Sequence, residues 1–300
     1  MAIPITEKKP EWLRVRAPSG DNYRSLKERL RTRTLYTVCE EAHCPNIGEC
    51  WSGGTATIMV MGDTCTRGCR FCNVKTGIPK TALDPAEPEK VAKTVQEMNL
   101  EYVVITTVDR DELPDQGAAH FANVVRAVKQ LNPRVLVETL AGDFRGTPEL
   151  THLLVDSGID VYSHNIETVE SLTPKVRDRR ASYRQSLDVL REVKRHNPRM
   201  VTKSSIMVGL GETREEVLQT MRDVRDTGAE IFTVGQYLRP TRRHLAVERY
   251  VTPDEFQEYE AEGLKMGYAF VASGPLVRSS YRAGEFFLKA FLDKRRTAEG

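Results

Sequence analysis

The strongest constraint on the fold is a regular alternation of short apolar runs with helical patterns. The apolar runs are short enough for buried strands, and they occupy residues 55–61, 102–108, 135–140, 160–167, 201–208, 230–235 and 269–272. Between them, apolar side chains recur at helical spacing, as in Val217, Met221 and Val224. Further helices are predicted over residues 88–99, 116–131, 148–157, 182–196 and 253–265. Strands that alternate with helices predict right-handed βαβ units and a parallel sheet.

The number of units predicts an α/β protein with a partial, TIM-like (β/α)6 barrel. A doubly wound open sheet is the alternative, because periodicity does not separate the two architectures. We expect the barrel over residues 55–277, an N-terminal extension over 1–54 and a C-terminal extension over 278–300. In either architecture, functional side chains gather where the strands end.

Composition excludes several classes of function. The 300-residue chain has a formal net charge of only +2, which gives no general basic field for nucleic acid. No apolar run approaches the roughly 20 residues needed to cross a bilayer. The first residues lack the apolar core of a secretory signal, so we expect a cytoplasmic protein that binds neither nucleic acid nor membrane.

The six cysteines form two trios within 34 residues. One trio follows the first predicted strand with C-x3-C-x2-C spacing, and the other precedes that strand with C-x4-C-x5-C spacing: Cys65, Cys69 and Cys72, and Cys39, Cys44 and Cys50. A disulfide framework suits small secreted domains, and structural zinc takes four closed ligands. Three thiolates in a tight loop suit an iron–sulfur cube instead, and they leave its fourth iron free for another ligand.

The loop Cys65-Thr66-Arg67-Gly68-Cys69-Arg70-Phe71-Cys72 resembles the signature of the radical S-adenosylmethionine (SAM) superfamily. The resemblance implies a [4Fe–4S] cluster at the mouth of a barrel, with SAM bound to the open iron. In that superfamily an electron from the cluster cleaves SAM to a 5′-deoxyadenosyl radical, which removes hydrogen from an unactivated carbon. This cluster, a second cluster implied by the other cysteine trio, and the radical would carry the catalysis, with no separate acid or base residue.

The other trio narrows the resemblance to one family. Residues 37–51, with Cys39, Cys44 and Cys50, are similar to the auxiliary-cluster segment of the lipoyl synthase family. Arg278-Ser279-Ser280-Tyr281 resembles the C-terminal motif of that family, which makes Ser279 the implied fourth ligand of an auxiliary [4Fe–4S] cluster. Taken alone, Ser279 and Ser280 could equally be a loop or a helix cap.

The lipoyl synthase resemblance implies a reaction and its partners. Two SAM molecules per turnover act as co-substrate, and the auxiliary cluster donates two sulfur atoms to C6 and C8 of a protein-bound N6-octanoyl-lysine. The implied substrates are octanoylated lipoyl carrier domains, as in 2-oxo acid dehydrogenase E2 subunits and glycine cleavage H protein. A reductant such as flavodoxin or ferredoxin and an iron–sulfur carrier that rebuilds the consumed cluster are also implied.

Several residues at strand ends are candidates for contacts to SAM. The resemblance implies a backbone contact from Phe71 to adenine and places Thr107 and Asp109 near the amino group of SAM. The positions of Asn165 and Glu167 at a strand end suit hydrogen bonds to the ribose and methionine parts. Met207 and Gly209 lie in residues 205–212, which partially match the superfamily's Gly-x-Ile-x-Gly-x-x-Glu pattern. Plainer roles stay open: packing for Phe71, a turn for Asp109, and a tight turn with a helix start after Gly209. His164 is expected to be structural.

Three functional hypotheses remain distinct. The first is a lipoyl synthase, and the second is another radical SAM sulfur-inserting enzyme with an auxiliary cluster. The third is a non-catalytic iron–sulfur or zinc scaffold, which metal analysis would separate from the other two. Arg239, Arg242 and Arg243 form a basic group after the sixth strand, and they would be either a solvated loop or a contact to an acidic carrier domain.

Overall fold

The computed structural model describes residues 9–14, 36–37, 40, 44, 46–47 and 57–280. Cys39 and Cys50 lie outside the described residues. The same is true of most of the predicted N-terminal extension and of the C-terminal extension after Ser280.

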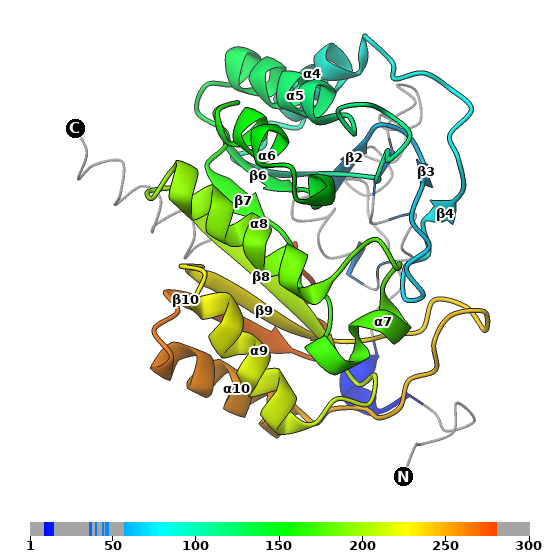
Figure 1. Cartoon of the computed structure of the whole chain (residues 1–300), viewed down its shortest axis with the longest axis vertical. Coiled ribbons are helices and arrows are strands. Elements are labelled where there is room, and N and C mark those ends of the chain that lie inside the picture. The colour runs from blue at the N-terminus through cyan, green and yellow to red at the C-terminus, as the bar shows by residue number, and fades with distance from the viewer. Residues whose placement is uncertain are drawn as a thin grey trace.

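The main sheet has eight strands in the order β1-β2-β5-β6-β7-β8-β9-β10 (Figure 1). β1 (Tyr36–Thr37) runs antiparallel to β2, and the remaining neighbours are all parallel. The parallel strands are β2 (Thr57–Val60), β5 (Tyr102–Thr107), β6 (Leu136–Leu140), β7 (Val161–Ser163), β8 (Val201–Val208), β9 (Ile231–Gln236) and β10 (Phe270–Gly274). A separate small sheet pairs β3 (Thr64–Cys65) with β4 (Lys75–Thr76).

Each of the first six parallel strands is followed by a helix. These helices are α4 (Glu87–Glu97), α5 (Ala118–Leu131), α6 (Pro148–Val155), α8 (Tyr183–His196), α9 (Arg214–Arg225) and α10 (Pro253–Lys265). Shorter elements are α7 (Thr173–Val176) and the 3-10 helices η1 (Glu11–Leu13), η2 (Phe144–Gly146) and η3 (Glu170–Leu172). Six β/α units followed by β10 confirm the predicted (β/α)6 arrangement.

The strand order identifies the architecture as a partial barrel. The parallel strands follow one another in chain order, without the reversal that defines a doubly wound sheet. Right-handed crossovers therefore place the helices on the same outer face, as Figure 1 shows. Within the described chain no ladder joins β10 back to β2, so the barrel stays open.

The two faces of the sheet carry different side chains because neighbouring residues of a strand point to opposite sides. Outward residues such as Val103 and Ile105 pack with Phe121 and Val124 of α5. A second cluster joins β8 and β9 to α8, α9 and α10. Inward residues at the amino ends form a small apolar layer, which consists of Leu136, Val161, Val201 and Ile231.

Three of the described α-helices, α8, α9 and α10, begin at side chains that cap them. Thr213 and Glu216 form a reciprocal capping box at α9, and Thr252 and Glu255 form another at α10. These caps satisfy amide groups that have no partner inside the helix. The local sequence thereby sets where the helices start, in agreement with the predicted boundaries.

The predicted strand over residues 160–167 is the main departure, because β7 ends at Ser163. The chain leaves the sheet and returns only at Glu167, which bridges to Ile206 and has a positive φ of 68°. The apolar pattern continues through this bend, so periodicity does not reveal it. β1, β3 and β4 were not predicted either, since two residues carry no period.

None of the helices in the described part of the chain is both long and apolar enough to cross a bilayer.

Candidate active site

A cavity of about 560 Å³ opens at the carboxyl ends of the parallel strands. It brings together eleven of the predicted site residues: Cys44, Cys65, Cys69, Phe71, Cys72, Thr107, Asp109, Asn165, Glu167, Met207 and Ser279. Gly209 is not among the lining residues, and Cys39 and Cys50 lie outside the described chain. The fold thus gathers residues that are more than two hundred positions apart in sequence.

Backbone amides already point at two of the three thiols in the C-x3-C-x2-C loop. The N–H groups of Arg67 and Asp109 donate to Cys65 Sγ at 3.4 and 3.3 Å. The N–H of Asp178 donates to Cys69 Sγ at 3.4 Å. Such hydrogen bonds stabilise a thiolate and tune an iron–sulfur cluster, so the donors fit a cluster at this site.

Burial controls the protonation of the same three thiols. It raises the pKa of Cys65 and Cys69 to about 12 and that of Cys72 to about 11. Without a metal the thiols are therefore protonated at neutral pH, and binding iron must release their protons. Among the described residues, no three His, Cys, Asp or Glu side chains converge as ligands of one metal ion. A [4Fe–4S] cube has no such requirement, because each thiolate binds its own iron.

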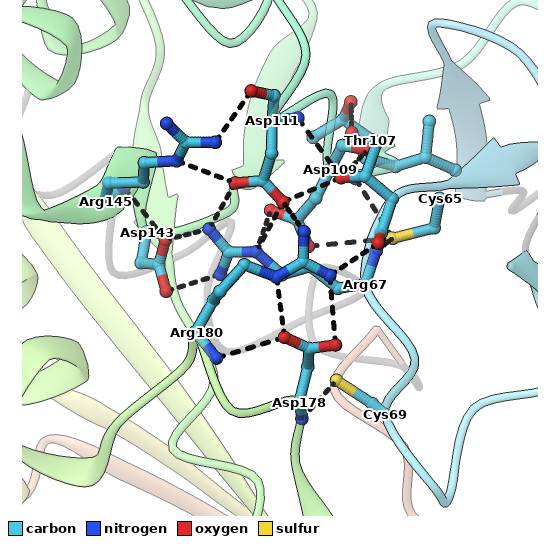
Figure 2. Close-up of polar contacts among 12 residues, drawn as sticks. Cys65, Arg67, Cys69, Thr107, Asp109, Asp111, Asp143, Arg145, Asp178 and Arg180 are labelled. Atoms are coloured by element: carbon cyan, nitrogen blue, oxygen red, sulfur yellow. Dashed lines mark hydrogen bonds and ion pairs between the residues drawn. The ribbon is translucent and has the colours of Figure 1, made fainter. Parts of the chain in front are cut away.

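Arg67, inside this loop, is buried against two aspartates (Figure 2). Its Nε and Nη2 donate to the two carboxylate oxygens of Asp111 at 3.1 and 3.0 Å. Its Nη1 and Nη2 donate to Asp143 at 2.6 and 2.7 Å. Burial acts to raise the pKa of Asp111, but hydrogen bonds from Arg67 and Thr66 outweigh it and hold the pKa at about 2. The carboxylates therefore stay charged opposite the guanidinium.

A third aspartate, Asp178, also contacts the loop. Asp178 accepts a hydrogen bond from the N–H of Gly68 at 2.9 Å. It also accepts one from Nε of Arg180 at 2.8 Å (Figure 2). Arg180 Nη2 also donates to the carbonyl of Thr66 at 2.6 Å. Hydrogen bonds from Arg180 lower the pKa of Asp178. The loop is thus fixed through both its side chains and its backbone.

Cys44 and Ser279 enter the same cavity from opposite ends of the chain. Asn46 Nδ2 donates to the carbonyl of Leu276 at 2.6 Å, which ties the two segments together. Burial raises the pKa of Cys44, and the nearby positive charge of Arg278 acts against that shift. A thiol and a hydroxyl thereby line the same cavity, and their role as auxiliary-cluster ligands stays a prediction.

Three buried polar atoms of cavity-lining residues have no hydrogen-bond partner among the described residues. They are Asn165 Oδ1, Arg177 Nε and Arg239 Nε. Asn165 Nδ2 donates to Glu167 Oε1 at 3.1 Å, which leaves its carbonyl oxygen free. Unpaired buried acceptors and donors are costly unless a ligand completes them, so these atoms fit a polar cofactor such as SAM. Arg177 directly follows α7, away from any predicted strand end, and it belongs to no motif in the sequence.

Other residues have the plainer roles that the sequence left open. Gly209 has a φ of 98°, and a Cβ there would lie 2.6 Å from the carbonyl of Arg249. It forms a tight turn whose N–H donates to Glu212 Oε1 at 2.5 Å. Phe71 packs against Tyr237 in a small apolar cluster at the cavity. A packing role is thus present for Phe71, and it is compatible with a backbone contact to adenine.

Two family models match the chain. One describes the radical SAM superfamily and covers residues 59–224, and the other describes the N-terminal domain of lipoyl synthase and covers residues 5–44. Mitochondrial lipoyl synthase from Aedes aegypti is 57% identical over 291 residues, which are 95% of this chain and 74% of the relative. Apicoplast lipoyl synthase from Plasmodium knowlesi is 55% identical, covering 98% of this chain and 67% of the relative.

Solved structures resemble the chain in fold. Methylornithine synthase aligns with a TM-score of 0.56 at 12% identity, covering 94% of this chain and 89% of the other. The FeFe-hydrogenase maturase HydG from Carboxydothermus hydrogenoformans gives 0.55 at 12% identity, over 94% and 72% of the two chains. These similarities show the fold alone. The radical SAM barrel, the N-terminal match and the identity to curated relatives together make this chain a member of the lipoyl synthase family.

Proposed function

We propose that this chain is a lipoyl synthase that inserts two sulfur atoms at C6 and C8 of a protein-bound N6-octanoyl-lysine. One observation carries the proposal: a single cavity is lined by Cys65, Cys69 and Cys72 and also by Cys44 and Ser279. Sulfur insertion needs a radical source and a sulfur source that reach the same carbon atoms. A shared cavity meets that requirement through proximity.

The residues divide into two ligand sets. Cys65, Cys69 and Cys72 hold the SAM-binding [4Fe–4S] cluster, and Ser279 joins the other trio in holding the auxiliary one. When bound, these groups supply a SAM-derived radical for hydrogen removal and two sulfur atoms for insertion. The chain itself orients SAM through Thr107, Asp109, Asn165, Glu167, Met207 and the backbone at Phe71. The same walls keep water from the reacting carbon.

The substrates follow from the family. They are octanoylated lipoyl carrier domains, of which E2 subunits and glycine cleavage H protein are the proposed forms. A flavodoxin or ferredoxin supplies electrons, and an iron–sulfur carrier rebuilds the auxiliary cluster. The same proposal divides the chain into an N-terminal extension over residues 1–54, a barrel over 55–277 and a C-terminal extension over 278–300.

The cellular location stays a prediction. A cytoplasmic protein was expected, whereas several curated relatives are named for mitochondria or the apicoplast. The relatives therefore give no support to a cytoplasmic assignment.

The alternatives have less support. A different sulfur-inserting radical SAM enzyme would not be expected to match the N-terminal lipoyl synthase model over residues 5–44. A zinc scaffold would bind one zinc per cysteine trio, whereas two [4Fe–4S] clusters bring about eight irons per chain.

The test uses the reconstituted chain with SAM, a low-potential reductant and an octanoyl-lysyl peptide, read by mass spectrometry. We expect a product that has gained two sulfurs and lost two hydrogens. Cys65→Ala should abolish both 5′-deoxyadenosine and the thiolated product, whereas Cys44→Ala should abolish only sulfur insertion. If the wild type forms 5′-deoxyadenosine but never a thiolated peptide, the sulfur-insertion proposal fails.

A further inference from the structure

We propose that Arg67 is a positioning residue that holds the cysteine loop in its cluster-binding shape before the cluster arrives. It acts through Asp111 and Asp143, which accept the hydrogen bonds of its side chain. The inference rests on the proposed assignment of Cys65, Cys69 and Cys72 to the SAM-binding cluster. Arg67 lies in the sequence between two of these proposed ligands, Cys65 and Cys69.

The geometry is a double fork. The guanidinium of Arg67 engages both oxygens of Asp111 at 3.1 and 3.0 Å and both oxygens of Asp143 at 2.6 and 2.7 Å (Figure 2). The three side chains are only 3%, 4% and 1% exposed. Asp111 and Asp143 follow β5 and β6, so one side chain ties the loop to the ends of two strands. A fork of this kind fixes direction as well as distance.

The neighbours of Arg67 are anchored as well. Thr66 N–H donates to the carbonyl of Asp109 at 3.0 Å, and Gly68 N–H donates to Asp178 at 2.9 Å. Each of the three residues between the first two cysteines is therefore held by groups of the protein itself. A loop fixed in this way loses little conformational freedom when a cluster binds, which favours binding.

Lysine should not replace Arg67. An ammonium is a compact point charge that cannot form parallel hydrogen bonds to two carboxylates. Arg67→Lys would keep the charge and lose the two forks. The fully folded chain would then contain a loop that is no longer directed toward the cluster.

Hydrogen exchange on the cluster-free full chain tests the preformed loop. In the parent we expect slow exchange in a peptide that covers residues 65–72, and in Arg67→Lys about tenfold faster exchange there, with β6 unchanged. The matched control is Arg184→Lys, because Arg184 makes the same fork onto Glu170 at 3.0 and 3.2 Å on the exposed surface. Equal exchange of the loop in the parent and in Arg67→Lys would overturn the inference.

The second readout is the SAM-induced change in the EPR spectrum of the reduced cluster. Its decay is followed over time after a chelator is added to the reconstituted chain. Loss of a partner outside the ligand shell typically weakens metal binding 10–100-fold, so Arg67→Lys should lose this signal at least about tenfold faster. If Arg67→Lys raises hydrogen exchange throughout the chain, the substitution has destabilised the whole fold, and Asp143→Asn is tested in its place. Asp143→Asn removes one of the two forks, so it should also speed the loss of the EPR signal. A variant that keeps its fold but loses the signal at the rate of the parent contradicts the inference. A SAM-responsive signal that survives Cys65→Ala would refute the cluster assignment itself.

Discussion

His164 and Arg177 line the cavity, and both contact the buried hydroxyl of Ser186. Arg177 Nη1 donates to Ser186 Oγ at 2.9 Å, and Ser186 Oγ lies 2.9 Å from His164 Nε2. A carbonyl can only accept, so in the neutral ring Nδ1 carries the proton beside Ala141, at 2.9 Å from its carbonyl oxygen, and Nε2 accepts the hydroxyl proton of Ser186. His164 is thus a neutral structural histidine, as expected.

The neutral state of His164 predicts a pH effect on stability. Burial, followed by the charge of Arg177, lowers the pKa of His164 to about 4. The unfolded chain binds a proton near pH 6.5, which the folded chain does not bind until about pH 4, so folding stability falls as pH decreases through this window. The loss should be about 2 kcal/mol between pH 7 and pH 5 for this group.

Urea unfolding of the cluster-free chain at both pH values measures this effect. His164→Gln should lower stability at pH 7 yet show a smaller further loss at pH 5. An identical pH dependence in the parent and the variant would count against the assignment.

Arg177 is the residue that sequence reasoning missed, and its free Nε predicts a role in SAM binding. We expect it to donate to the carboxylate of SAM. Arg177→Met should weaken SAM binding about 10–100-fold, because a hydrogen bond to a charged group contributes roughly 1.5–3 kcal/mol. Equilibrium dialysis of the reconstituted chain with SAM measures the change. Arg177→Lys should recover part of the affinity, and unchanged binding in Arg177→Met would exclude the contact.

At the scale of elements, β9 and the segment that follows β10 depend on one glycine. Gly235 faces the inside of the barrel, and a Cβ there would lie 2.1 Å from the carbonyl oxygen of Val277. No backbone can tolerate that approach, so the segment that carries Ser279 crosses β9 only because residue 235 lacks a side chain. The register of β9 therefore sets the position of Ser279, the proposed auxiliary ligand.

Gly235→Ala should disrupt the auxiliary site and spare the other cluster. The added methyl displaces Val277 and, with it, Ser279. We expect iron content to fall from about eight to about four per chain, with the SAM-responsive EPR signal retained. Gly274→Ala is the control, because its Cβ meets only a methyl of Val277 at 3.2 Å. Full iron content in Gly235→Ala would contradict the proposed placement.

Element boundaries were largely predictable. Helix α10 runs from Pro253 to Lys265 as predicted, because Thr252 and Glu255 cap it and its apolar face has helical spacing. β7 was predicted too long, since the bend before Glu167 is imposed by the neighbouring β8 and not by local preference.

At the scale of the whole molecule, an ion pair occupies the middle of the barrel. Lys203 Nζ on β8 lies 2.8 and 3.0 Å from the carboxylate oxygens of Glu138 on β6, and both side chains are 1% exposed. Ser163 Oγ donates to the same carboxylate at 2.7 Å. Tyr102 Oη on β5 also donates to this carboxylate at 2.5 Å, so the group around Glu138 joins four strands between the apolar bottom layer and the cavity.

Lys203→Met should destabilise the chain by about 3–5 kcal/mol, because it leaves the charge of Glu138 buried and unpaired. Adding Glu138→Gln should recover much of the loss. The free energy of unfolding in urea, measured for the parent and both variants, checks the prediction. If Lys203→Met were as stable as the parent, Glu138 would not carry a buried charge in the fold.

The sequence by itself determined the parallel α/β architecture, the two cysteine trios and the family. These are properties of local spacing: period two and 3.6 in the apolar pattern, and short intervals between ligands within one loop. Only the tertiary structure decided that Cys44 and Ser279 share a cavity with Cys65, that Gly209 is a turn residue, and that Arg67 lies between two aspartates. Those facts depend on how the loops at the strand ends meet across the barrel mouth, and such contacts join residues that are far apart in the chain.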